Sequence, residues 1–135
     1  MVVEESVRFS LLDAEAPMEW SSTSPPGEGS VRLGPDGRLF YLSMFHELHC
    51  LRRFQQLLRY PLSAVDVAHT QHCFNYLRQC SLCQADRTLE VGNFITRNFT
   101  SDRVGATHTC KDWSVVYDKV TYNWSKWIDE MPTSD

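Results

Sequence analysis

One five-residue pattern occurs twice in this chain, as His46-Glu47-Leu48-His49-Cys50 and again as His69-Thr70-Gln71-His72-Cys73. The two copies hold four of the five histidines in the sequence. The fifth, His108, lies two residues before Cys110, so every histidine is near a cysteine. Clusters of imidazole and thiol side chains are typical of a metal site.

Helix geometry explains the spacing inside each copy, because residues i, i+3 and i+4 share one helical face. In the second copy the same face continues through Tyr76, Cys80 and Cys83. Two imidazoles one turn apart can bind a metal ion, and two facing helices would offer four imidazoles to a common centre. One such pair alone would more often be a packed histidine pair, but two copies favour metal. The predicted metal ligands are His46, His49, His69, His72 and His108, with the thiolates of Cys50 and Cys73 as further candidates.

The two copies also decide the fold class. We predict one helix over Ser43–Arg59, capped by Ser43, and a second over Asp66–Cys83, capped by Ser63 or Asp66. The short connection makes them an antiparallel hairpin. A third helix, capped by Asp112, carries an apolar stripe of Trp113, Val116, Tyr117, Val120, Trp124 and Trp127. The expected fold is therefore mainly α, a small helical domain whose antiparallel hairpin carries the metal site, with an irregular N-terminal arm and long loops.

The rest of the chain is predicted to be less regular. Residues 1–38 are an arm and a Pro/Gly linker, with a short strand near Val7–Leu12, and residues 39–135 are the helical metal-binding domain. The Ser/Pro/Gly composition of Ser21–Gly29 argues against a packed element. Val31–Leu33 and Arg38–Tyr41 suggest a small hairpin. Residues 84–112 are read as loop with short strands at most.

Composition narrows the function classes. The 135 residues carry a net charge of −4, which argues against a nucleic-acid partner. We find no apolar stretch long enough for a membrane segment and no secretory signal. Five cysteines nevertheless favour an oxidising compartment, so we expect the lumen of the secretory pathway or secretion. Asn98-Phe99-Thr100 is a glycosylation candidate there, whereas Asn123-Trp124-Ser125 borders the apolar stripe.

Four segments, residues 45–52, 69–79, 82–90 and 108–113, resemble the UstYa-like fungal oxidases, which carry the doubled His-x-x-His-Cys signature. The likeness extends from Tyr41 to Trp127. It departs from the family at Glu47, where Gln is usual, and at Cys80, which is an additional cysteine. The usual family chain also has an N-terminal membrane anchor, which we do not find here.

The resemblance implies a copper enzyme of fungal secondary metabolism with the doubled motif as its copper site. Family members carry out macrocyclisation of ribosomal peptides, and hydroxylation or chlorination of peptides and small metabolites. We therefore expect one or two copper ions, O₂ as co-substrate, and a peptide or small-metabolite substrate. Because family members often act as pairs of related chains, we also expect a homodimer or a heterodimer with a related chain.

The cysteines have two interpretations. Cys50 or Cys73 could bind copper as thiolates. Alternatively, the positions that match the family's cysteines could form disulfides between separate segments, which we favour for an oxidising compartment: Cys50, Cys73, Cys83 and Cys110. Cys73 and Cys83 cannot pair with each other, because a helix separates them by about 15 Å.

Two further side chains are candidates for a role in the reaction. Tyr76 shares the histidine face and is the catalytic candidate, as a hydrogen-bond donor or a radical relay. Arg53 could pair with a substrate carboxylate, although an arginine in this position is more often solvated. The alternative to an oxidase is a helical scaffold or partner subunit, held by structural zinc or by disulfides, without redox chemistry of its own.

Overall fold

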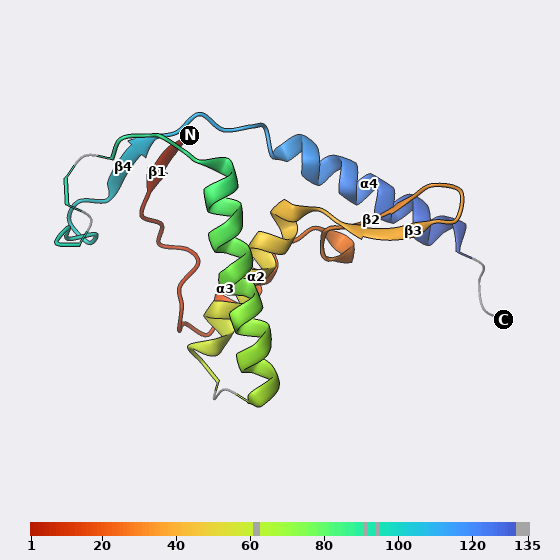
Figure 1. The fold of residues 1–135 in the computed structure, drawn as a ribbon, viewed down its shortest axis with the longest axis horizontal. Helices are drawn as coiled ribbons and strands as arrows, with labels where there is room; N and C mark the ends of the chain where they lie inside the picture. Colours follow the sequence, from red (N-terminus) through yellow and green to blue (C-terminus); the bar gives the residue numbers. More distant parts are fainter. Residues whose placement is uncertain (61–62, 91, 94, 132–135) are drawn as a thin grey trace.

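Figure 1 shows the computed structural model of the chain, which describes residues 1–60, 63–90, 92–93 and 95–131. Helices α2 (Ser43–Leu57) and α3 (Ala64–Gln84) cross near the middle of the molecule, and helix α4 (Ser114–Glu130) extends to one side along a β-hairpin. The remaining elements are β1 (Val2–Glu4), α1 (Ala16–Ser21), the 3-10 helix η1 (Pro26–Gly29), β2 (Ser30–Leu33), β3 (Arg38–Tyr41) and β4 (Val104–Thr107).

The mainly α architecture predicted from the sequence is confirmed. In the described part of the chain, four α-helices contain about half of the residues, and the strands form two separate two-stranded sheets. The predicted β-hairpin of residues 31–41 is also confirmed, because β2 and β3 pair antiparallel from Ser30↔Tyr41 to Leu33↔Arg38. None of the helices described is both long and apolar enough to cross a membrane.

The starts of α2 and α4 differ from the prediction by one residue. Ser43 is the first helical residue of α2, and Leu42 occupies the N-cap position without a side-chain cap, so the predicted Ser43 cap was wrong. The helix also ends before Arg59. Asp112 does bond the start of α4, since its Oδ1 accepts the backbone N–H of Ser114 at 3.0 Å. A carboxylate there is favourable because the first N–H groups of a helix have no intrahelical partner.

Helix α3 begins at a pair of reciprocal hydrogen bonds between Ser63 and Asp66. The Ser63 hydroxyl accepts the backbone N–H of Asp66 at 3.2 Å, and the Asp66 carboxylate accepts the backbone N–H of Ser63 at 2.9 Å. This reciprocal pair is a capping box, so Ser63 is the cap. Asp66 also forms an ion pair with Arg53 near the end of α2. The contact links α2 to the first turn of α3. The predicted antiparallel order of the two helices is confirmed by their histidine contacts, because His46 meets the later His72 and His49 meets the earlier His69.

The predicted strand near Val7–Leu12 was wrong. The strand lies earlier, at β1, and pairs antiparallel with β4 from the opposite end of the sequence. Phe9 adopts a left-handed backbone conformation, with φ of 60°, which interrupts an extended strand. Helix α1 was not predicted, although Pro17 in its first turn is a common helix-start residue.

The Ser/Pro/Gly segment Ser21–Gly29, which precedes β2, was predicted not to form a packed element, and this was wrong. Gly27 and Gly29 have φ of 76° and 79° and lie directly against neighbouring helices. A Cβ at Gly27 would be 2.4 Å from the ring of Trp124 in α4, and a Cβ at Gly29 would be 2.3 Å from Phe45 in α2. The missing side chains therefore let the backbone pass closely between α2 and α4.

The core joins three distant parts of the chain. Val31, Phe45 and Val120 are buried together, surrounded by the half-buried Leu42, Met44, Leu48, Val116 and Tyr117. Asn123 in α4 fixes the hairpin, because its Oδ1 accepts the backbone N–H of Arg32 at 2.7 Å and its Nδ2 donates to the Arg32 carbonyl at 3.0 Å. Val31 lies within residues 1–38, so part of that segment shares a core with α2 and α4.

Candidate metal centre and adjoining cavity

The four motif histidines face one another across α2 and α3 as two imidazole pairs. Nε2 of His46 lies 3.3 Å from Nε2 of His72, and Nε2 of His49 lies 3.4 Å from Nε2 of His69. The rings of each pair are close to parallel, at 25° and 26°. Because the helices run antiparallel and both motifs have the same spacing, the first histidine of one motif meets the second histidine of the other.

The two pairs remain distinct. The ring centroids of His46 and His49 are 6.3 Å apart. Among the described residues, no group of three or more His, Cys, Asp or Glu side chains is arranged to hold one metal ion. The structure thus brings together the four predicted ligands of the doubled motif, but as two two-nitrogen sets and not around one common centre.

The surroundings of the two α2 histidines favour their neutral form. Burial is the main cause that lowers the pKa of His46, followed by the neighbouring His72 and His69. Burial likewise lowers the pKa of His49, followed by His69 and His46. A neutral ring has a free nitrogen lone pair, which is the form that binds a metal ion.

Tyr76 lies against one of the pairs. Its ring stacks on His46, with 4.0 Å between ring centroids and 29° between ring planes, and its centroid is 6.1 Å from that of His72. Burial raises the pKa of the Tyr76 phenol, whose neighbours include Ser43 and Cys80. The sequence-based catalytic candidate is therefore beside the His46–His72 pair as a protonated hydrogen-bond donor.

The two motif cysteines are buried together between the helices. Cys50 and Cys73 are both 0% exposed. Burial, followed by the neighbouring thiol of Cys73, raises the pKa of Cys50 to about 12, which keeps it a neutral thiol. Cys83 and Cys110 are exposed, and all five cysteines are free in the structure. Cys50 and Cys73 meet from two different helices, as the predicted disulfides between separate segments would require, but disulfide formation and metal ligation both remain predictions.

His108 belongs to neither imidazole pair. Its Nδ1 lies 2.7 Å from the carboxylate of Asp86, and its buried Nε2 has no hydrogen-bond partner among the described residues. The pKa of Asp86 is lowered to about 2, mainly by the backbone N–H and hydroxyl of Thr88 and then by His108. The structure therefore places His108 in a separate carboxylate–imidazole contact that ties the segment after α3 to the segment before α4.

A cavity of about 560 Å³ opens beside the imidazole pairs. Its walls include the α2 histidine of each pair, and its lining residues are Glu28, Tyr41, Phe45, His46, His49, Arg52, Arg53 and Gln56. The volume is in the range of pockets for small molecules. The arrangement places a cavity of small-molecule size directly next to the candidate metal ligands.

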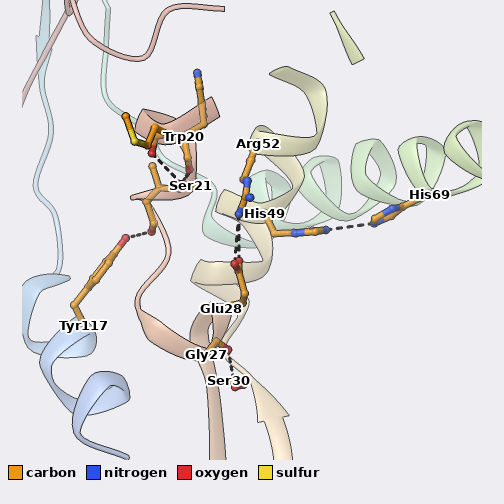
Figure 2. Close-up of polar contacts among 11 residues, drawn as sticks. Trp20, Ser21, Gly27, Glu28, Ser30, His49, Arg52, His69 and Tyr117 are labelled. Atoms are coloured by element: carbon orange, nitrogen blue, oxygen red, sulfur yellow. Dashed lines mark hydrogen bonds and ion pairs between the residues drawn. The ribbon is translucent and has the colours of Figure 1, made fainter. Parts of the chain in front are cut away.

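Glu28 and Arg52 were missed by the sequence reasoning. Glu28 has φ of 56°, an uncommon value for a residue with a side chain, and lies between the tightly packed Gly27 and Gly29. Figure 2 shows its carboxylate reaching Arg52 beside the His49–His69 pair, at an N–O distance of 3.4 Å. A charged residue held in a strained turn next to a cavity is a common feature of functional sites. The Gly-Glu-Gly triplet was the available signal.

The two glycosylation sequons differ in their surroundings. Asn98 is exposed, and its Oδ1 accepts the backbone N–H of Thr100 at 3.0 Å. Asn123 is half-buried and uses both polar atoms of its amide to hold the backbone of β2. The structure therefore leaves Asn98 as the accessible candidate.

Comparison with known proteins covers most of the chain. The family model described as mycotoxin biosynthesis protein UstYa matches residues 5–130. Hydroxylase cctR of Talaromyces islandicus is 31% identical over 120 residues, which cover 83% of this chain and 44% of the relative. UstYa family oxidase phomYb of Diaporthe leptostromiformis is 31% identical over 118 residues, which cover 73% and 46%. Oxidase ustYa of Aspergillus flavus is 35% identical over 79 residues, which cover 56% and 37%.

These matches agree with the resemblance seen in the doubled motif. The chain spans less than half the length of these curated relatives. No solved structure matches it. The family match extends from before the first helix to the end of α4 and includes the segments that carry the imidazole pairs, the cavity and Glu28. The chain belongs to the UstYa family.

Proposed function

We propose that this chain is a copper-dependent oxidoreductase of fungal secondary metabolism that oxidises C–H or O–H bonds of a peptide or small metabolite. The outcome would be macrocyclisation, hydroxylation or halogenation. Relatives named oxidase or hydroxylase support the reaction class. The observation that carries the proposal is the pairing of imidazole Nε2 atoms across α2 and α3.

The donor set fits copper. Imidazole nitrogen is a suitable ligand for copper. Two metal–nitrogen bonds of about 2.0 Å allow nitrogens up to about 4 Å apart, and the observed separations of 3.3 and 3.4 Å fall within this limit. The lowered pKa values of His46 and His49 favour the neutral ligand form. When bound, copper would supply one-electron redox chemistry with O₂ as co-substrate.

The residues of the chain would position the substrate and its protons. The cavity would hold the substrate beside His46 and His49, and the buried ring of Phe45 would form an apolar wall that keeps water away. Tyr76 would donate a hydrogen bond next to the His46–His72 pair. The copper ligands in this proposal are the four paired histidines, because Cys50 and Cys73 adjoin each other and His108 is bonded to Asp86.

The metal content of double His→Ala variants tests the assignment of the copper ligands. If each pair holds one copper, His46→Ala with His72→Ala removes one pair and should leave about half of the native copper. His46→Ala with His69→Ala breaks both pairs and should leave almost none. His108→Ala is the control and should keep the native amount. Copper is measured by elemental analysis after dialysis, together with the circular dichroism of each variant.

The outcomes separate the alternatives. Full copper loading in the variant with both pairs broken would refute the proposal. Complete loss in the variant with only one pair broken would indicate a single shared centre. A protein that retains zinc, and whose copper form consumes no O₂ in the presence of a reductant, would support a structural zinc site in a scaffold or partner subunit.

We also propose that the chain works in the secretory lumen or outside the cell, and as a homodimer or a heterodimer with a related chain. Its five cysteines favour an oxidising compartment. Helix α4 and the residue before it expose large aromatic rings, with Trp113 55% and Tyr122 70% exposed. Exposed apolar surface of this kind is suited to contact with a second chain.

A further inference from the structure

The cavity beside the imidazole pairs contains two arginines in different electrostatic situations. Arg53 forms an ion pair with Asp66 and donates to the Gln56 side chain at 3.4 Å. Its charge is therefore already balanced by a carboxylate from the first turn of α3. The Arg53 side chain is 20% exposed and lines the cavity.

Arg52 is held much more loosely. Within the part of the chain that the structure describes, its guanidinium makes polar contacts with Glu28 alone, at 3.4 and 3.5 Å. The Glu28 side chain is 62% exposed, against 26% for Arg52. An ion pair this long, with one partner largely in solvent, is weak. Arg52 is thus a partly buried cation that can accept a better anionic partner.

The turn that carries Glu28 fixes where that partner would sit. Gly27 and Gly29 press against Trp124 and Phe45, so the backbone on both sides of Glu28 has little freedom to shift. The exposed side chain of Glu28 can still rotate away into solvent. Its carboxylate therefore occupies a position that a carboxylate of a bound molecule could take, with the planar guanidinium free to bind both oxygens.

We propose that the cavity binds a substrate with a free carboxylate, recognised by Arg52 in exchange for Glu28, and that the apolar or aromatic body of this substrate lies against Tyr41 and Phe45. The inference rests on the proposed function only for the role of the bound molecule as substrate. The cavity volume of about 560 Å³ suits a small organic acid or the acidic end of a peptide. Its position brings that molecule beside His46 and His49.

Binding of a matched acid and amide tests this assignment. The probes are N-acetylphenylalanine and N-acetylphenylalaninamide, which share a body and differ in the carboxylate. Isothermal titration calorimetry on the full chain, both metal-free and copper-loaded, should show the acid binding at least about tenfold more tightly than the amide, because charge-assisted bonds to guanidinium are strong. Arg52→Ala should abolish the difference, and Arg52→Lys should keep part of it.

Two further variants sharpen the test. Glu28→Gln removes the competing carboxylate and should strengthen binding of the acid without changing binding of the amide. Arg78 is an exposed residue of α3 that does not line the cavity, so the Arg78→Ala variant is the control and should bind the acid and the amide as the native chain does. The carboxylate preference should also weaken as salt is added.

Several outcomes would overturn the proposal. They are equal binding of acid and amide by the native chain, no binding of either, an acid preference that survives Arg52→Ala, or weaker acid binding in Glu28→Gln. The metal-free arm separates this result from the copper proposal. An acid preference without copper, in a chain that fails the metal analysis, would leave the binding site established and the oxidase refuted.

Discussion

Replacing Gly29 with alanine should destabilise the fold through the turn that carries Glu28. Gly29 has φ of +79°, a left-handed conformation that costs other residues about 1–2 kcal/mol. The added methyl carbon would lie 2.3 Å from Cβ and Cγ of Phe45, a side chain that is only 1% exposed. Overpacking of a filled core costs a further 1–3 kcal/mol or so. The expected loss in the free energy of unfolding is therefore about 2–5 kcal/mol, a large share of the 5–15 kcal/mol typical of a domain.

Gly34→Ala is the matched control for this experiment. Gly34 has a similar φ of +77°, but no described atom lies within 4 Å of an added Cβ, so only the backbone cost applies. Urea unfolding followed by tryptophan fluorescence gives both free energies of unfolding. Gly29→Ala should lose about 1–3 kcal/mol more than Gly34→Ala. Equal losses would show that the turn does not press on Phe45, and the packing argument would be wrong.

Four other outcomes are expected. Cys50, whose pKa is raised to about 12 by burial and by its neighbouring thiol, should resist alkylation at about pH 8.5 while Cys83 reacts, as measured by peptide mass spectrometry. Because the pKa of Asp86 is lowered to about 2, mainly by Thr88 and then by His108, these contacts stabilise the fold above the ordinary pKa of the carboxyl and stop doing so as the pH falls toward 2. The difference in unfolding free energy between the native chain and Asp86→Asn should shrink over that window, and a constant difference would contradict the contacts of the Asp86 carboxylate with Thr88 and His108. Asn123→Ala should lower the free energy of unfolding by about 1–3 kcal/mol in a urea titration, because it leaves two backbone groups of β2 unpaired. Light scattering of the chain alone or with a related chain should give the mass of a dimer, and a strictly monomeric mass from an active preparation would exclude pairing.

The helices of the candidate site could be predicted because their signals are local. The spacing within each His-x-x-His-Cys motif defines one helical face, and the Ser63–Asp66 capping box lies within four consecutive residues. The sequence therefore predicted both helices, their antiparallel direction and the four histidines that meet. It did not predict that His46 would meet His72 and that His49 would meet His69, because this depends on the register between the helices.

The features that the sequence did not predict depend on contacts between distant segments. Strand β1 pairs with β4, which lies far from it in the sequence, so no local sequence signal near β1 indicates this partner. Glu28 lies in a stretch whose Ser, Pro and Gly content is typical of a loop, and only the contacts of the flanking glycines with α2 and α4 show that it is packed. The same absence of a side chain that makes glycine common in loops also permits this close approach.

Each imidazole pair takes one nitrogen from α2 and one from α3, so neither helix contains a complete pair by itself. Any ion that bridges a pair therefore acts as a cross-link between the two helices, and the unfolded chain, in which the motifs are apart, cannot offer the same ligands. Metal affinity is then coupled to the stability of the helical hairpin, and at a hundredfold excess over the dissociation constant one bound ion would add about 2.7 kcal/mol to the free energy of unfolding. In the proposed copper enzyme, metal supply would in this way determine how much of the protein stays folded, in addition to how much of it is active.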